Sequence, residues 1–291
     1  MRLSFCLAAG LTVLCAAAAQ AQARPDVRAG ACDLPHARGV TAQSLTSGQR
    51  PRTYRLFVPP GYDGRQRLPL VLDLHGSGGN AAGEAGNSRL EALAAGETFL
   101  VATLEAESGT WNVPVEKDRP DDVAYAGDVI DHVSAQACVD ASRIYATGFS
   151  GGARMSSLLG CGLGARLAAI APVSGLRAPA ATCPARPIPV ITFHGLADPQ
   201  NPYEGHVPGR AAWVESVPDA LRDWAAHNKC KEKVVLEDPP GPLSTMRYEG
   251  CGAGAEVRLI RIDGLGHRWT HDEVDTTGVM WQFFKGHPLK P

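Results

Sequence analysis

Apolar residues along the chain fall into short runs that alternate with segments whose apolar positions recur every three or four residues. The short runs are typical of strands and the spaced segments of amphipathic helices. Strands are predicted at 53–58, 68–74, 99–104, 143–147, 167–173, 188–193 and 257–262, and helices at 122–137, 153–159, 217–228 and 277–284. This alternation favours an α/β fold with a mainly parallel sheet flanked by helices. No repeat, charge block or Ser/Gly-rich linker follows residue 24, so one domain is predicted over 24–291.

The N-terminus has a composition of its own. Arg2 is followed by an uncharged apolar run over 3–19, which ends in small residues and an Ala21-Gln22-Ala23 motif. This pattern is typical of a cleaved secretory signal peptide, with an uncleaved membrane anchor as the alternative. No later stretch is long and apolar enough to span a membrane. We therefore predict a signal peptide over 1–23 and a secreted or periplasmic protein without membrane association after cleavage.

The charge balance narrows the possible partners. The chain has 28 Lys and Arg against 30 Asp and Glu, a formal net charge of −2. A nucleic-acid-binding protein needs a basic excess, so this class is excluded. Hydrophobic residues make up 44% of the chain and charged residues 20%, which is typical of a folded globular protein.

Six cysteines remain after the predicted signal peptide, an even number that suggests disulfides in an exported protein. They allow about 15 pairings, and the sequence alone does not choose among them. Our hypothesis is Cys230–Cys251, Cys161–Cys183 and Cys32–Cys138, because the first two pairs close short loops and the third would attach the N-terminal segment.

A G-x-S-x-G motif, Gly148-Phe149-Ser150-Gly151-Gly152, lies between a predicted strand and a predicted helix. A sharp strand-to-helix turn of this kind exposes a serine hydroxyl above the sheet, and small neighbours leave room for the turn. We therefore predict that Ser150 is a nucleophile, the alternative being an incidental serine in a Gly-rich turn.

A serine nucleophile needs a base that is oriented by an acid. In such folds the acid and then the base follow the serine along the chain. Asp198 comes directly after the predicted strand at 188–193, whereas two later aspartates fall within a predicted helix. His267 comes after the strand at 257–262 and a Gly-rich loop. The predicted acid and base are therefore Asp198 and His267, with His271 as the reserve base.

Backbone N–H groups near Ser150 are expected to stabilise a developing oxyanion. The N–H of Gly151 follows the nucleophile, and the Gly-rich segment 74–80 places the N–H of Ser77 after an early strand. A phosphate-binding loop would end in Lys followed by Ser or Thr, which this segment lacks. His267 and His271 have no third ligand in the sequence pattern, so neither a metal nor a cofactor is predicted.

Four motifs in this order carry a resemblance to a known group: Leu74-His75-Gly76-Ser77-Gly78-Gly79-Asn80, Gly148-Phe149-Ser150-Gly151-Gly152-Ala153, Phe193-His194-Gly195-Leu196-Ala197-Asp198 with Pro202-Tyr203, and Gly266-His267-Arg268-Trp269. From about Arg52 onward the chain resembles the secreted polyhydroxybutyrate depolymerase-like and feruloyl esterase-like enzymes of carbohydrate esterase family one. The resemblance implies an α/β-hydrolase fold and a Ser-Asp-His triad, here Ser150, Asp198 and His267. Two positions depart from the family pattern, since Thr270 replaces a Pro and Gly151 replaces an Asn.

The function predicted from these observations is a secreted serine esterase that forms an acyl-enzyme without a cofactor. Trp111, Tyr203 and Trp269 are expected to form aromatic walls of the site, with core packing as the alternative. The segments between the motifs are too short to hold a large lid domain, so an open site is expected. An open site suits an ester on a polymer. Feruloyl-type esters on plant polysaccharide are favoured over polyhydroxyalkanoate. A peptidase, an acyltransferase and a non-catalytic binding protein stay open as alternatives.

Overall fold

The computed structural model describes residues 32–181, 183, 186–205, 215–231, 234–236 and 242–290. The predicted signal peptide lies outside these residues. The strands are β1 (Gly39–Ser47), β2 (Arg50–Val58), β3 (Leu68–Leu74), β4 (Leu100–Leu104), β5 (Val139–Phe149), β6 (Ala169–Val173), β7 (Val190–Gly195), β8 (Val234–Leu236), β9 (Leu243–Tyr248) and β10 (Val257–Ile262). The helices are α1 (Ala81–Ser88), α2 (Leu90–Glu97), α3 (Asp122–Gln136), α4 (Gly151–Gly162), α5 (Val217–His227) and α6 (Thr276–Gly286).

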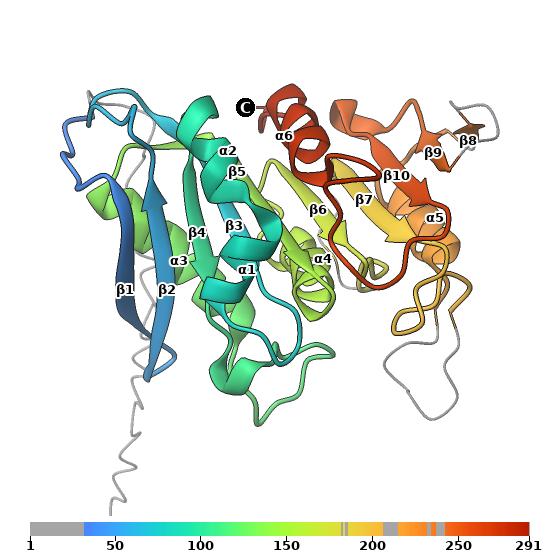
Figure 1. Cartoon of the computed structure of the whole chain (residues 1–291), viewed down its shortest axis with the longest axis horizontal. Coiled ribbons are helices and arrows are strands. Elements are labelled where there is room, and N and C mark those ends of the chain that lie inside the picture. The colour runs from blue at the N-terminus through green and yellow to red at the C-terminus, as the bar shows by residue number, and fades with distance from the viewer. Residues whose placement is uncertain are drawn as a thin grey trace, which may run out of the picture. The chain divides into compact units, whose positions relative to one another are not determined.

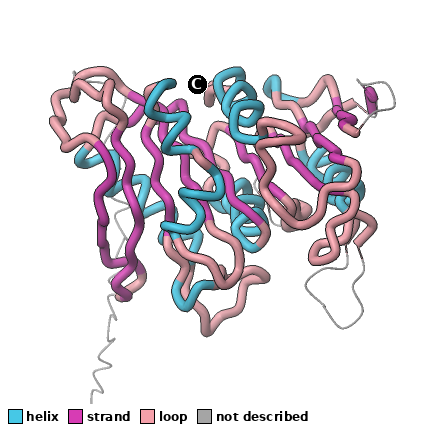
Figure 2. Tube along the Cα trace, viewed as in Figure 1, coloured by secondary structure: helices cyan, strands magenta, loops and turns pink. Residues whose placement is uncertain are grey.

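The strands, labelled in Figure 1 and coloured magenta in Figure 2, form one sheet in the order β1-β2-β4-β3-β5-β6-β7-β10-β9-β8. Its central strands, from β4 to β10, pair in parallel, whereas β1 and β2 at one end and β9 and β8 at the other are antiparallel. The predicted fold class, a mainly parallel sheet flanked by helices, is therefore confirmed.

Two hydrophobic layers cover the two faces of the sheet. Alternate residues of β3 point to opposite faces, so that Leu70 and Leu72 belong to one layer and Val71 to the other. The first layer contains apolar residues of α3, α4 and α5, and the second contains those of α2 and α6. Figure 1 shows α1, α2 and α6 in front of the sheet and α3, α4 and α5 behind it. Both faces of β3 are thus buried, which explains its uninterrupted apolar run.

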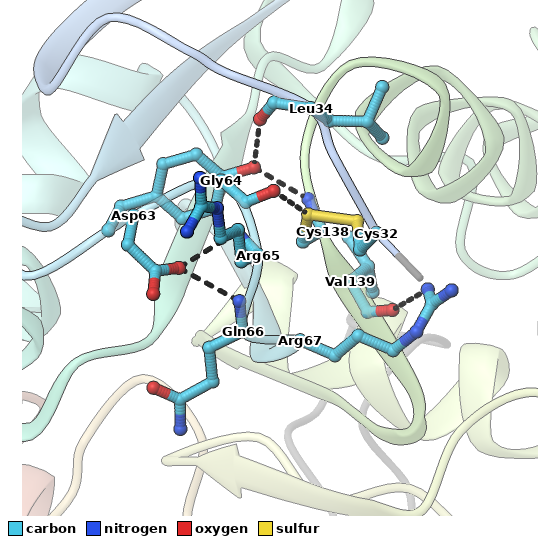
Figure 3. The surroundings of a disulfide bond; sticks show 10 residues. Cys32, Leu34, Asp63, Gly64, Arg65, Gln66, Arg67, Cys138 and Val139 are labelled. Atoms are coloured by element: carbon cyan, nitrogen blue, oxygen red, sulfur yellow. Dashed lines mark hydrogen bonds between the residues drawn. A yellow bond between two sulfur atoms is a disulfide. The ribbon is translucent and has the colours of Figure 1, made fainter. Parts of the chain in front are cut away.

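All three cysteine pairings proposed from the sequence are present as disulfides: Cys32–Cys138, Cys161–Cys183 and Cys230–Cys251. The first joins residues 106 positions apart and attaches the N-terminal segment beside the start of β5 (Figure 3). Hydrogen bonds support this attachment, because the N–H of Leu34 donates to the carbonyl oxygen of Gly64 at 3.0 Å. The hydroxyl of Tyr62 in turn donates to the carbonyl oxygen of Leu34 at 2.5 Å.

Five elements were not predicted from the sequence: β1, α1, α2, β8 and β9. Four of them lie at the ends of the sheet or are helices of eight residues. No helix among the described residues has the length and apolar character needed to cross a bilayer.

Candidate active site

The turn between β5 and α4 holds Ser150 in a strained backbone conformation, with φ 54° and ψ −110°. Glycines make this turn possible. A Cβ atom on Gly152 would lie 1.9 Å from the carbonyl oxygen of Leu74, and one on Gly148 would lie 2.5 Å from the same atom. Both distances are far below van der Waals contact, so β3 can approach the turn only where side chains are absent. The strained turn directs the Ser150 hydroxyl away from the sheet.

Ser150, His267 and Asp198 form a continuous row of hydrogen bonds. The Ser150 Oγ–H donates to Nε2 of His267 at 2.9 Å, and Nδ1–H of His267 donates to Oδ2 of Asp198 at 2.7 Å. The three residues come from the ends of β5, β10 and β7, which are parallel neighbours or near neighbours in the sheet. Their side chains meet because the carboxyl ends of parallel strands share one edge.

The Asp198 side chain is fully buried, and hydrogen bonds from protein groups take the place of water around it. Its Oδ1 accepts the backbone N–H groups of Gln200 and Asn201 at 2.8 and 2.9 Å. Burial alone would raise the pKa of Asp198, but the hydrogen bonds from His267 and from the backbone outweigh it and lower that pKa. The carboxyl group is therefore an anion that can stabilise a protonated imidazole.

Asn201 and His194 support this acid, and the sequence analysis did not single out a role for either. His194 is fully buried, and its Nε2–H donates to the carbonyl oxygen of Asn201 at 2.8 Å. Burial lowers the pKa of His194, which favours its neutral form. Asn201 also donates from Nδ2 to the carbonyl oxygen of Ser174 at 2.6 Å. The only sequence signal for this support was the Asp-Pro turn that begins at Asp198.

Gly151 and Ser77, the two predicted oxyanion donors, are neighbours in the structure. Gly151 is the first residue of α4. Its N–H therefore has no acceptor within the helix, like the other N–H groups of a first helical turn. A Cβ atom on Gly151 would lie 3.0 Å from the backbone nitrogen of Ser77, so the two residues are in close contact. His75 fixes this loop, because its Nε2 accepts the N–H of Ala106 at 3.0 Å while Nδ1–H donates to the carbonyl oxygen of Gly76 at 2.8 Å.

Comparison with known proteins matches residues 52–201 to the model of the family described as Esterase PHB depolymerase. The chain belongs to this family. It is therefore a carboxylic ester hydrolase by family, as the sequence motifs predicted. The chain is 32% identical to feruloyl esterase B of Piromyces equi over 79% of its length, but spans only 44% of that relative. It is 28% identical to feruloyl esterase C of Emericella nidulans, covering 80% of this chain and 83% of that one.

The solved structures that resemble this esterase identify its fold. An acetyl xylan esterase from Aspergillus awamori aligns with a TM-score of 0.59 at 15% identity, over 84% of this chain and 99% of that one. An S-formylglutathione hydrolase from Agrobacterium tumefaciens aligns with a TM-score of 0.58 at 13% identity, over 88% and 98% of the two chains. The fold is the α/β-hydrolase fold that the motifs implied.

The three aromatic residues expected as walls of the site are nearly inaccessible. Trp111, Tyr203 and Trp269 expose 4%, 8% and 5% of their surface, and all three belong to the hydrophobic core. The Trp111 indole N–H donates to the carbonyl oxygen of His75 at 2.7 Å, whereas that of Trp269 donates to Oγ1 of Thr277 at 3.1 Å. This burial is what core packing requires, and the role of the three rings as walls of the site stays a prediction.

His271, the reserve base, lies in a different environment from His267. Its Nε2–H donates to the carbonyl oxygen of Asn87, at the end of α1, at 2.9 Å. Thr277 makes a parallel contact, since its hydroxyl donates to the carbonyl oxygen of Ser88 at 2.6 Å. The segment that follows the base is thus attached to α1 at two points.

A buried pair of acids, Asp73 and Glu84, lies beside the Gly-rich segment 74–80. Asp73 is the second-last residue of β3 and is 0% exposed, and its Oδ2 accepts a hydrogen bond from the hydroxyl of Ser88 at 2.7 Å. Burial raises the pKa of Asp73 to about 7. Burial also raises the pKa of Glu84, and the neighbouring charge of Asp73 adds to this effect. These acids retain protons at a pH where exposed carboxyl groups have lost them.

The variant Asp73→Asn is expected to be more stable than the wild type at about pH 8, with the difference vanishing below about pH 4. In the unfolded chain Asp73 loses its proton near pH 4, whereas in the folded protein it retains the proton up to about pH 7. The unfolded state is therefore favoured as the pH rises through this interval, and an amide removes that dependence. Urea unfolding at several pH values measures the effect.

The exposed Asp263 provides the control. Asp263→Asn removes a carboxyl group outside the buried pair, and its unfolding profile is the baseline for the comparison. Parallel pH profiles for the wild type and Asp73→Asn would contradict the assigned titration.

Proposed function

We propose that this protein is a secreted serine esterase that releases feruloyl-type acids from plant polysaccharide. The observation that carries the proposal is the unbroken hydrogen-bonded row of Ser150, His267 and Asp198 at the carboxyl edge of the sheet. A carboxylate, an imidazole and a hydroxyl in this order are the groups that acyl transfer through a serine requires. Residues 24–291 would form one catalytic domain after removal of the signal peptide.

The proposed mechanism begins with attack of the Ser150 Oγ on the ester carbonyl while His267 Nε2 accepts the hydroxyl proton. The N–H groups of Gly151 and Ser77 stabilise the oxyanion of the tetrahedral intermediate. His267 then donates the proton to the departing alkoxide, which leaves the acyl group on Ser150. Water attacks the acyl-enzyme by the same route and regenerates the serine. Asp198 stays ionised throughout, and no cofactor takes part.

Support for the acyl group comes from the relatives, since several are named feruloyl esterases. The family name favours a second candidate, a polyester depolymerase on the same fold. Support for export comes from the signal-like pattern over 1–23 and from three disulfides, which persist in oxidising compartments.

Steady-state hydrolysis tests the substrate class. We expect kcat/KM for methyl ferulate or methyl coumarate to exceed that for hydroxybutyrate oligomers by about tenfold or more, equivalent to about 1.4 kcal/mol of transition-state binding. Rapid clearing of polyhydroxybutyrate films with negligible release of cinnamate would move the assignment to the polyester candidate. A fluorophosphonate probe should label Ser150, and absence of labelling would indicate a non-catalytic binding protein.

A further inference from the structure

The segment 105–111, which follows β4, contacts the Gly-rich segment 74–80, which begins at the end of β3. Because β3 and β4 are parallel neighbours, their carboxyl ends bring the two segments to the same edge of the sheet. The N–H of Gly78 donates to the carbonyl oxygen of Gly109 at 2.8 Å. Ser77 directly precedes Gly78, so the position of this predicted oxyanion donor depends on the segment 105–111.

Glu105 and Ala106 hold the two ends of the Gly-rich segment. At one end the N–H of Ala106 donates to Nε2 of His75 at 3.0 Å. At the other end Oε2 of Glu105 accepts the N–H of Ala81 at 2.8 Å. Oε1 of Glu105 lies 3.7 Å from His75 Nε2, which is already an acceptor, so the carboxylate contacts this ring without a hydrogen bond.

The contact with Ala81 joins the start of α1 to the end of β4. Ala81 is the first residue of α1, so its N–H has no acceptor within the helix, and the positive end of the helix dipole favours a carboxylate there. The Glu105 side chain is 33% exposed, so water can replace a missing carboxylate. Water would satisfy the N–H but would not attach α1 to β4. Loss of the carboxylate should therefore impair positioning more than stability.

The backbone of Glu105 is held independently of its side chain. Its N–H donates to the carbonyl oxygen of Thr53 at 3.2 Å, and its carbonyl oxygen accepts a hydrogen bond from Nη2 of Arg52 at 3.2 Å. Arg52 in turn forms a buried ion pair with Asp122 at 2.7 Å. A fixed backbone thus carries the carboxylate, and truncation of this side chain to a methyl group should leave the fold intact.

We propose that Glu105 is a positioning residue for the oxyanion donor Ser77. Its carboxylate fixes the start of α1, and with it the Gly-rich segment, which keeps Ser77 in close contact with Gly151. The proposal rests on the proposed function, in which the N–H groups of these two residues stabilise the oxyanion. Since the oxyanion exists in the transition state and not in the bound ester, Glu105 should affect kcat more than KM.

Steady-state kinetics of Glu105→Ala on p-nitrophenyl acetate test this role, with active sites counted by fluorophosphonate labelling. We expect kcat per active site to fall about tenfold, less than the loss of about 10²–10³-fold that follows removal of an oxyanion donor. KM should change by about twofold or less. Glu105→Gln should recover at least about half of the wild-type kcat, because its amide oxygen can still accept the N–H of Ala81.

Glu107→Ala is the matched control, since it makes the same change of charge two positions further along the same segment. The exposed carboxylate of Glu107 pairs with Arg50 at 2.7 Å, away from the Gly-rich segment. This variant should retain a kcat close to that of the wild type.

A phenyl trifluoromethyl ketone distinguishes positioning from a loss of folded protein. The Ser150 Oγ adds to its carbonyl carbon, the hydroxyl proton passes to His267, and the carbonyl oxygen becomes an oxyanion that needs the same N–H donors. Its inhibition constant should therefore rise about tenfold in Glu105→Ala. A smaller folded fraction alone would leave this constant unchanged.

Three results would overturn the positioning role while the esterase assignment stands: an unchanged inhibition constant in Glu105→Ala, a kcat equal to that of Glu107→Ala, or equal losses in Glu105→Ala and Glu105→Gln. A wild-type protein that neither hydrolyses the aryl ester nor binds the ketone would instead refute the proposed function.

Discussion

The Ser150→Ala variant is expected to lose at least about 10³-fold in kcat on a soluble ester while retaining the wild-type fold. The Ser150 hydroxyl lies 2.9 Å from His267 Nε2 and is the group that would form the acyl-enzyme. Without it, the oxyanion N–H groups can still bind and polarise an ester, which accounts for a small residual rate. Initial rates on p-nitrophenyl esters, with circular dichroism to verify folding, measure this effect.

Two histidine variants control this result. His267→Ala should lose activity to a similar extent, because Ser150 and His267 act as a unit and their effects do not add. His271→Ala should retain most of the activity, since His271 contacts the carbonyl oxygen of Asn87 rather than the triad. Half of the wild-type rate in Ser150→Ala, or equal losses in the two histidine variants, would refute the assigned nucleophile and base.

The residues of the triad could be selected from the sequence because each follows a strand with a strong local signal. Ser150 lies in a Gly-rich motif, Asp198 directly precedes a Pro, and His267 follows a Gly-rich loop. The parallel topology then brings strand ends together without further information. Aromatic residues carry no such signal, because a ring that lines a site and a ring that packs in the core have the same sequence pattern. Trp269 illustrates this, since its burial and its contact with Thr277 become visible only in the structure.

The helices and strands that the sequence did not predict also lack a strong local sequence signal. β1 alternates half-buried and exposed residues and pairs only with β2 at the end of the sheet, so its sequence lacks an apolar run. α1 contains two glycines within eight residues and depends on its Asn80 cap, whose side chain accepts the N–H of Gly83 at 2.8 Å. Helices of this length are marginal by propensity and form through tertiary packing.

The Gly152→Ala variant is expected to fold poorly or to lose about 5 kcal/mol or more of stability, a loss larger than that of most point variants. The added Cβ would lie 1.9 Å from the carbonyl oxygen of Leu74 and 2.7 Å from that of His75. Both obstacles are backbone atoms, one at the end of β3 and one in the segment that follows it, and neither can move aside without separating α4 from the sheet. Any folded fraction should also be inactive, because relief of the clash displaces the Ser150 turn from Ser77.

Gly86→Ala is the matched control, since Gly86 lies within α1 and a Cβ there meets no atom within 4 Å. Alanine has the higher helix propensity, so this variant should gain about 0.5–1 kcal/mol. Comparing the urea midpoints of the two variants separates a steric requirement at one glycine from a general effect of adding a methyl group. A Gly152→Ala protein as stable and active as the wild type would mean that β3 and α4 do not approach as closely as the distance to Leu74 indicates. The glycine would then not be what holds the nucleophile in its strained turn.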